Sequence, residues 1–250
     1  MSETFVIADS HIQHHNSIFH GWREQFISPN PNYDPTQPKN YKTNFPYLAD
    51  LEAHDEYMVE MWNKTATRKD KIIILGDLIW KNHIDYIKRL NGHKFLIRGN
   101  HDKMHNDAYK LFNQIEGAHY RYSWYTKING RRVMLSHCPY DNWFSSCHGS
   151  WHLYGHCHGS KEELPWSLSF DCGYDVWGGL IPWDVIVAKM THKEEIKKAY
   201  YSGRLSKFQC ILKWEAYKAK IRLLHQGRKS KRRLNVTINR EINKKYLKGM

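Results

Sequence analysis

The sequence contains few cysteines and lacks a long apolar run. Its five cysteines make an odd count without paired spacing, so we expect free thiols in a reducing cytoplasm and not a disulfide framework. No stretch approaches the roughly 18 consecutive apolar residues of a spanning helix. Together with a mean hydropathy of -0.74, this excludes a membrane-spanning protein. The first nine residues lack the basic and apolar regions of a signal peptide, so we expect none.

Acidic residues are scarce in the last 60 residues. This segment has 18 basic and 4 acidic side chains, whereas the first 190 residues have 20 basic and 21 acidic ones. Histidine shows the opposite distribution, because 15 of the 17 histidines lie in the first 190 residues. We therefore expect two units with separate roles, a histidine-rich domain over residues 1–190 and a basic extension over residues 191–250.

The rest of the composition indicates a folded α/β protein. Apolar residues make up 41% of the chain, enough to bury a core without disulfides. Short apolar runs typical of buried strands occur at residues 5–8, 72–75, 95–97, 133–136 and 185–187. Helical spacing occurs at residues 48–66, 83–91 and 107–115, and a hairpin is predicted around Asn129-Gly130. This alternation predicts a layered α/β fold, with a partly helical extension after it.

Polar residues follow the apolar runs where each run ends. The motifs are Asp9-Ser10-His11, Gly76-Asp77, Gly99-Asn100-His101-Asp102, Ser136-His137 and Gly155-His156-Cys157-His158. Because ligand sites in α/β sheets lie at the carboxyl ends of strands, these side chains can meet in space. In the first and last motifs, an extended backbone would point both outer side chains to the same side.

These side chains have the chemistry of metal ligands. Carboxylate, imidazole and amide groups without a thiolate suit Mn, Fe, Zn or similar ions and argue against a structural zinc cage. Seven such ligands are too many for one tetrahedral ion and fit two ions that share a carboxylate. Two ions roughly 3.5–4 Å apart can clamp a phosphoryl group and activate water near neutral pH.

The same motifs carry a family resemblance. The ordered series Asp-x-His, Gly-Asp, Gly-Asn-His-Asp, His and Gly-His-x-His resembles the calcineurin-like metallophosphoesterase superfamily. Residues 9–16, 55–63, 90–92 and 172–177, together with Arg23, are similar to its small bacterial and phage phosphoesterases. The resemblance covers roughly residues 4–188, and it implies a catalytic domain with an αββα sandwich fold.

The resemblance also implies roles for individual residues. It assigns Asp9, His11, Asp77 and His158 to one metal ion, and Asp77, Asn100, His137 and His156 to the other. The ions would be divalent, with Mn as the first choice and Fe, Zn, Ni or Mg as alternatives. His101 would assist at the phosphate or the leaving group, and Asp102 would hold its tautomer. Arg23 and His14 align with positions expected to touch the substrate phosphate.

The resemblance implies metal-dependent hydrolysis of phosphoesters. Residues 76–82 lack the Gly-Asp-x-x-Asp-Arg-Gly motif of phosphoprotein phosphatases, which disfavours protein dephosphorylation. The basic run at residues 227–233 favours a phosphodiesterase or nuclease acting on nucleic acid or nucleotides. A phosphomonoesterase for a small metabolite and a non-catalytic binding scaffold are the alternatives. The extension could instead pack on the core or contact an anionic membrane surface.

Overall fold

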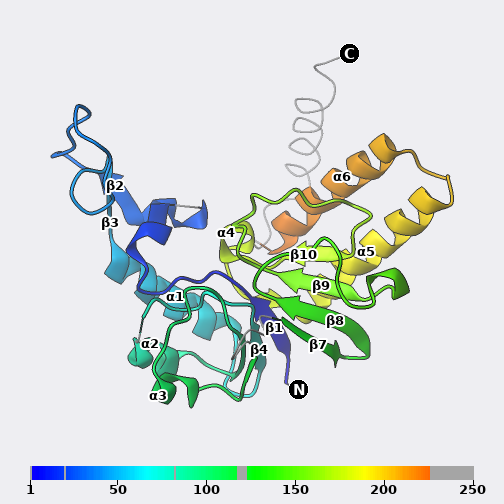
Figure 1. Ribbon diagram of the computed structural model, residues 1–250, viewed down its shortest axis with the longest axis horizontal. Coiled ribbons are helices and arrows are strands. Elements are labelled where there is room, and N and C mark those ends of the chain that lie inside the picture. Colours follow the sequence, from blue (N-terminus) through cyan, green and yellow to red (C-terminus); the bar gives the residue numbers. More distant parts are fainter. Residues whose placement is uncertain (1, 20, 82, 117–122, 226–250) are drawn as a thin grey trace.

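The computed structural model describes residues 2–19, 21–81, 83–116 and 123–225, and it confirms the mixed α/β class (Figure 1). In this part of the chain, one sheet has the strand order β11-β1-β4-β5-β6. Its strands are β1 (Thr4–Ile7), β4 (Lys71–Ile74), β5 (His93–Ile97), β6 (Gln114–Glu116) and β11 (Ile181–Pro182). All its neighbouring strands are parallel except β11, which pairs antiparallel with β1.

The second large sheet has the strand order β10-β9-β8-β7. Its strands are β7 (Ser123–Ile128), β8 (Arg131–Ser136), β9 (Trp151–Tyr154) and β10 (Ser169–Asp171). The predicted hairpin is confirmed as β7–β8, where Asn129 (φ 48°) and Gly130 (φ 81°) adopt the left-handed conformations of a type I′ turn. A short pair, β2 (Ile27–Pro29) and β3 (Tyr47–Ala49), projects from the body in Figure 1.

The helices agree in part with those predicted from the sequence. They are α1 (Leu51–Thr65), α2 (Ile84–Arg89), α3 (Asn106–Tyr109), α4 (Tyr174–Trp177), α5 (Trp183–Tyr201) and α6 (Lys207–His225), with 3-10 turns η1 (His15–Phe19), η2 (Gly21–Phe26) and η4 (Ser146–His148). The strand predicted at residues 185–187 is wrong, because this run lies in α5. There the helix buries Ile186 together with Met190, one turn later, so tertiary packing overrides the β-branched composition. The helix predicted over residues 107–115 ends early, and β6 occupies its last part.

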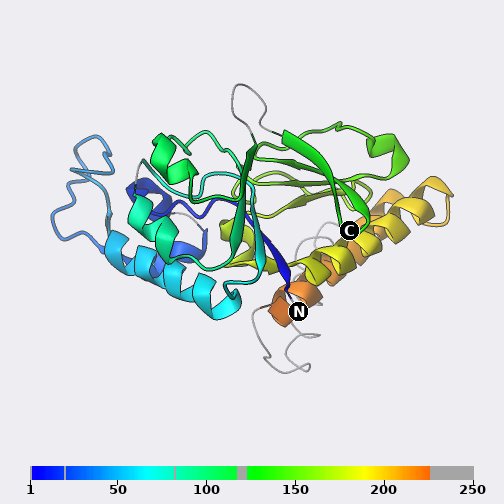
Figure 2. The ribbon, with the colours of Figure 1, turned by 90° about the horizontal axis from the view of Figure 1, so that it is seen from below.

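Two hydrophobic clusters of described residues fix the strands. Successive strand residues point to opposite faces, so Ile72 and Ile74 of β4 pack with Trp62 of α1, while Ile73 packs with Leu153 of β9. The second cluster therefore contains residues of both large sheets. Figure 2 shows α1–α3 and the α5–α6 pair on opposite sides of the strands.

The predicted extension begins inside a helix. α5 continues through residue 190, and α6 packs against it with Trp214 only 1% exposed. The basic run at residues 227–233 lies outside the described residues, so its role and the proposed domain division stay predictions. Within the described ranges, no helix is both long and apolar enough to cross a membrane.

A buried ion-pair cluster joins α5 to the segment before β10. Glu163 carboxylate oxygens lie 3.2 Å from Lys189 Nζ and 3.0 Å from Lys193 Nζ. Burial favours protonation of Glu163, but the two ammonium groups outweigh it and lower its pKa to about 2. Because the folded pKa is depressed, the stabilisation is present above the unfolded pKa and is lost as the pH falls through the window from about 4.5 to about 2.

We expect Glu163→Gln to lower the free energy of unfolding by about 3 kcal/mol near neutral pH. The difference from wild type should shrink by about 2 kcal/mol between about pH 6 and about pH 3, measured by urea unfolding. Glu60→Gln, which removes an exposed pair with Lys64, is the control and should show almost no difference at either pH. A Glu163→Gln difference that does not change with pH would contradict this account.

Candidate metal centre

Each polar motif lies where a strand ends. Asp9, Asp77 and Asn100 follow β1, β4 and β5 of the five-stranded sheet, whereas His137 and His156 follow β8 and β9 of the four-stranded sheet. Neighbouring parallel strands place their carboxyl ends at one edge of a sheet. The contacts described below show that the two edges face each other.

The backbone turns sharply at these strand ends. Asp9 (φ 56°) and His11 (φ 50°) are left-handed, as are His156 (φ 72°) and His158 (φ 48°). The extended backbone expected at Asp9-Ser10-His11 and at His156-Cys157-His158 is therefore wrong. The chain has to leave the sheet within one or two residues, and left-handed residues achieve this at a cost of about 1–2 kcal/mol each. As a result, His156 and His158 join different groups.

Two glycines make room for carboxylates. A Cβ on Gly99 would overlap the Asp77 side chain, and a Cβ on Gly155 would lie 2.8 Å from Asp9 Oδ2. A larger residue at either position would displace a candidate ligand.

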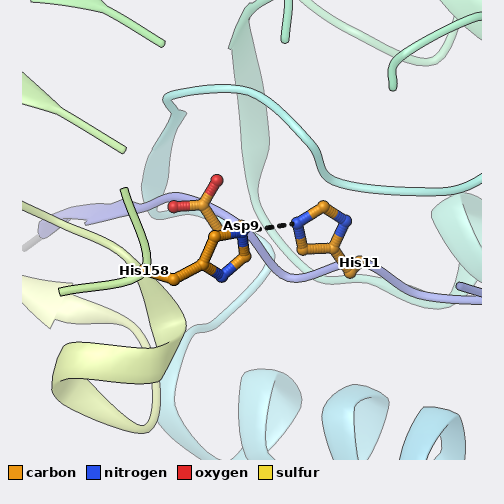
Figure 3. A group of neighbouring side chains, drawn as sticks. All are labelled: Asp9, His11 and His158. Atoms are coloured by element: carbon orange, nitrogen blue, oxygen red, sulfur yellow. Dashed lines mark hydrogen bonds between the residues drawn. The ribbon is translucent and has the colours of Figure 1, made fainter. Parts of the chain in front are cut away.

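Asp9, His11 and His158 form the first group (Figure 3), in which the candidate ligand atoms all lie within 4.8 Å of one another. The Nε2 atoms of His11 and His158 face each other at 3.4 Å. Since the lone pairs of two neutral rings would repel, this approach requires a proton or a cation between them. Burial raises the pKa of Asp9 to about 7, which shows how unfavourable its charge is without a cation nearby.

Asp77, His137 and His156 form the second group. His137 Nδ1 lies 2.9 Å from the Leu75 carbonyl oxygen, so this nitrogen is the donor. The other ring nitrogen, Nε2, lies 2.9 Å from Asn100 Oδ1, 3.1 Å from His156 Nδ1 and 3.3 Å from Asp77 Oδ2. Burial lowers the pKa of His137, but the Asp77 carboxylate outweighs it and raises the pKa to about 9. This cluster also attracts positive charge.

The Asp77 carboxylate lies between the two groups. Its Oδ2 is 3.3 Å from His137 Nε2 in the second group and 3.8 Å from His11 Nε2 in the first. Its Oδ1 accepts a hydrogen bond from the backbone N–H of His101 at 2.9 Å. A single carboxylate can therefore reach cations in both groups.

All seven predicted ligands lie close together. Three belong to the first group, three to the second, and Asn100 adjoins the second. Carboxylate, imidazole and amide donors fit divalent ions such as Mn, Fe, Zn or Ni. These residue groups could bind metal, and their individual roles as ligands stay predictions.

His101 and Asp102 differ from each other in position. The His101 ring is 32% exposed, with Nε2 3.9 Å from Asp77 Oδ2, so it lies at the rim of both groups. Asp102 is fully buried and accepts hydrogen bonds from the backbone N–H groups of Asp77, Leu78 and Gly99 at 2.8–3.0 Å. The expected contact with the His101 ring is not among these bonds. Asp102 instead holds the turns that carry Asp77 and Asn100.

His14 and Arg23, which were both expected near the substrate phosphate, differ in their exposure. His14 lies beside the first group, with Nδ1 3.2 Å from His11 Nδ1, and it remains half-exposed. Arg23 is fully buried, and its guanidinium donates to the carbonyl oxygens of Asp9 and Ser10 and to Asp175. The prediction that Arg23 touches a substrate phosphate is therefore not supported by its position.

Two contacts at the site were not predicted from the sequence. Trp80 stacks on His14 with ring centroids 4.3 Å apart and planes at 8°, and it also contacts His101. No local sequence pattern indicates this contact. Asp175, in the segment 172–177 that carries part of the resemblance, bonds to His158 Nδ1.

Comparisons with known proteins find distant relatives. No family model matches the chain. It is 27% identical over 171 residues to an uncharacterized protein of Methanocaldococcus jannaschii (66% of this chain, 75% of that protein) and 25% identical over 170 residues to the Gene 66 protein of Mycobacterium phage D29 (57% and 85%). Among solved structures, the chain is similar to a protein of unknown function from Aquifex aeolicus (TM-score 0.49, 20% identity, covering 75% of this chain and 99% of that one). It is also similar to Yfce, a phosphoesterase from E. coli (TM-score 0.31, 14% identity, covering 68% of this chain and 78% of that one). At these levels, none of the four establishes a family or an activity.

The shared position of Asp77 yields a prediction about metal content. Asp77→Asn should lose most of the bound Mn²⁺ in both groups, because the amide removes the charge that offsets repulsion between two cations. Elemental analysis after equilibration with Mn²⁺ measures this. Asp70→Asn is the control, since Asp70 is a buried carboxylate just before β4 that accepts from Glu3 and Thr67. Two ions per chain in Asp77→Asn would rule out the shared carboxylate.

Proposed function

We propose that the chain is a two-metal phosphoesterase with the αββα sandwich of the metallophosphoesterases. The observation that supports this most strongly is the position of the Asp77 carboxylate, within 4 Å of imidazole nitrogens in both groups. A cation pair that shares one carboxylate can clamp a phosphoryl group and stabilise the negative charge that develops on its oxygens during hydrolysis. Two divalent ions held there would supply activation of water and neutralisation of developing charge.

The protein groups have separate tasks in this proposal. The two groups hold the ions, and Asp102 fixes the turn that carries Asp77 through backbone hydrogen bonds. His101 is partly exposed, as are His156 and His158, and its Nε2 lies 3.9 Å from the same carboxylate oxygen. From this rim position, its Nε2 would donate a proton to the leaving oxygen or a hydrogen bond to a non-bridging phosphate oxygen.

Two chromogenic esters test the reaction class. With added Mn²⁺, we expect faster hydrolysis of bis(p-nitrophenyl) phosphate than of p-nitrophenyl phosphate, as for a phosphodiesterase. The reverse order would favour a phosphomonoesterase. No turnover of either ester with any divalent metal would favour the binding scaffold and overturn the proposal.

The substrate that we propose is a phosphodiester of nucleic acid or nucleotides. Part of the basic extension, α6, packs on the rest of the chain through Trp214. Residues 226–250 contribute 9 basic and one acidic side chain. Such a concentration of positive charge favours contact with a phosphate backbone.

The rim position of His101 yields a kinetic prediction. His101→Ala should keep its metal ions and lose about 10²–10⁴-fold in rate, the usual contribution of a positioned acid. The loss should be smaller for p-nitrophenolate, which needs little protonation, than for an alkoxide leaving group. His148→Ala, at an exposed histidine of η4, is the control and should keep its rate. An equal loss for both leaving groups would assign His101 to the non-bridging oxygen.

The basic run yields a prediction about salt dependence. Glutamine at five positions should weaken nucleic-acid binding, and each lost phosphate contact should flatten the slope of log K against log salt by about 0.7–0.9. The positions are Arg228, Lys229, Lys231, Arg232 and Arg233. A control with the same charge change uses five exposed cations elsewhere, Lys64, Arg68, Lys69, Lys88 and Lys110. Equal salt slopes for both variants would remove the nucleic-acid role from this run.

A further inference from the structure

A row of buried polar side chains runs from α1 to the first group. It consists of Asp55, His54, Arg23 and Asp175, and it ends on His158. The first three side chains are fully buried, and that of Asp175 is 1% exposed. Buried polar groups are costly unless each has a partner, so a row of this length is a built feature and not a surface accident.

The row fixes which nitrogen of His158 faces the first group. Asp175 bonds to His158 Nδ1 through Oδ2 and to Arg23 through Oδ1. Because a carboxylate can only accept, His158 Nδ1 carries the proton and Nε2 is directed at His11. A side chain at Gly21 would overlap Asp175, so the position of this carboxylate depends on that glycine.

The next two side chains set the orientation of the guanidinium. Arg23 Nε donates to His54 Nε2 at 3.2 Å, so the proton of the neutral His54 ring is on Nδ1. Nδ1 then donates to Asp55 Oδ1 at 2.8 Å. Arg23 also donates to the Asp9 carbonyl oxygen at 2.7 Å, which holds the left-handed residue that supplies the carboxylate of the first group.

The row also holds the loop that carries His11. Asp55 accepts from the backbone N–H of Gln13 at 3.1 Å and from its side-chain amide at 2.6 Å. The loop contains three left-handed residues, Asp9, His11 and Gln13, each of which costs about 1–2 kcal/mol. Arg23 binds one end of this loop and Asp55 binds the other, so both ends are fixed.

The second group has different support. His137 Nδ1 bonds to the Leu75 carbonyl, and Asp102 holds the backbone at Asp77. Among the described residues, no hydrogen bond joins the row to Asp77, His137 or His156. The two groups do touch each other, because the backbone N–H of His156 donates to the Asp9 carboxylate at 2.9–3.0 Å and that of His11 donates to the Asp77 carbonyl oxygen at 2.9 Å. The row therefore supports the first group directly and reaches the second only through the first.

We propose that Asp55, His54, Arg23 and Asp175 are positioning residues that act directly on the first group, and we name them the α1 relay. The relay orients His158 and fixes the main chain at Asp9 and His11. The inference rests on the proposed two-metal centre and adds an asymmetry to it. Breaking the relay weakens one metal-binding step much more than the other.

Calorimetric titration of metal-free protein with Mn²⁺ tests the asymmetry. Asp175→Asn should weaken one of two binding steps by about 10–100-fold, the usual effect of removing a carboxylate behind a ligating histidine. The other step should weaken much less, and Asp70→Asn should leave both steps unchanged. Two unchanged steps, or two steps weakened alike, would overturn the proposal.

Two variants at His54 provide a second test that does not alter the contact with His158. His54→Gln keeps one acceptor for Arg23 and one donor for Asp55, so it should bind Mn²⁺ almost as wild type does. His54→Leu removes both bonds and should weaken the same single step as Asp175→Asn. Equal affinity of the two His54 variants at that step would count against the relay.

Nitrogen-15 NMR of the metal-free wild-type protein separates the relay from the proposed function. At alkaline pH, the neutral His158 ring should be protonated on Nδ1, and Asp175→Asn should lose this preference. A ring protonated on Nε2 in wild type would overturn the relay. Absence of metal binding by wild type would overturn the two-metal proposal, and the NMR result would still decide the tautomer.

Discussion

The crowding of two carboxylates and four imidazoles at one centre is the constraint on which the rest of the structure depends. Facing ring nitrogens lie 3.4 Å apart in the first group and 3.1 Å apart in the second, and each pair requires a shared proton or a cation between the two nitrogens. Removing the carboxylates from water has its own cost, seen in the raised pKa of Asp9. The opposite shift at His137, whose pKa is raised to about 9, has the same origin, because protonation supplies the missing positive charge. Both shifts favour a cation at this centre.

The surrounding fold counters the strain of this arrangement. Left-handed residues at the strand ends aim the ligands inward, and glycines behind them leave room for the carboxylates. Backbone hydrogen bonds to Asp102 hold the turns near the second group, whereas Arg23 and Asp55 hold the loop of the first. Hydrophobic clusters on both faces of β1 and β4 keep the strand ends in place. A preorganised site of this kind needs little rearrangement to accept a charged ligand.

The sequence was sufficient to predict which residues meet, because carboxyl ends of parallel strands share an edge and short polar motifs mark those ends. It was not sufficient for the geometry. The left-handed conformation of Asp9 and His11 depends on contacts with Arg23 and with residues of α1, which no local pattern reveals. Arg23 was assigned to substrate from the family resemblance, and no local pattern reveals its partner Asp175, which lies 152 residues away. The run at residues 185–187 has strand composition, yet packing of the long helix α5 decides its conformation.

The central claim is that two cations share the Asp77 carboxylate. A crystal structure of the wild-type protein grown with Mn²⁺, with anomalous scattering recorded for manganese, tests it most directly. The account predicts two anomalous peaks, one among Asp9, His11 and His158 and the other among Asp77, Asn100, His137 and His156, roughly 3.5–4 Å apart with Asp77 between them. A single peak, or two peaks of which only one contacts Asp77, would contradict it.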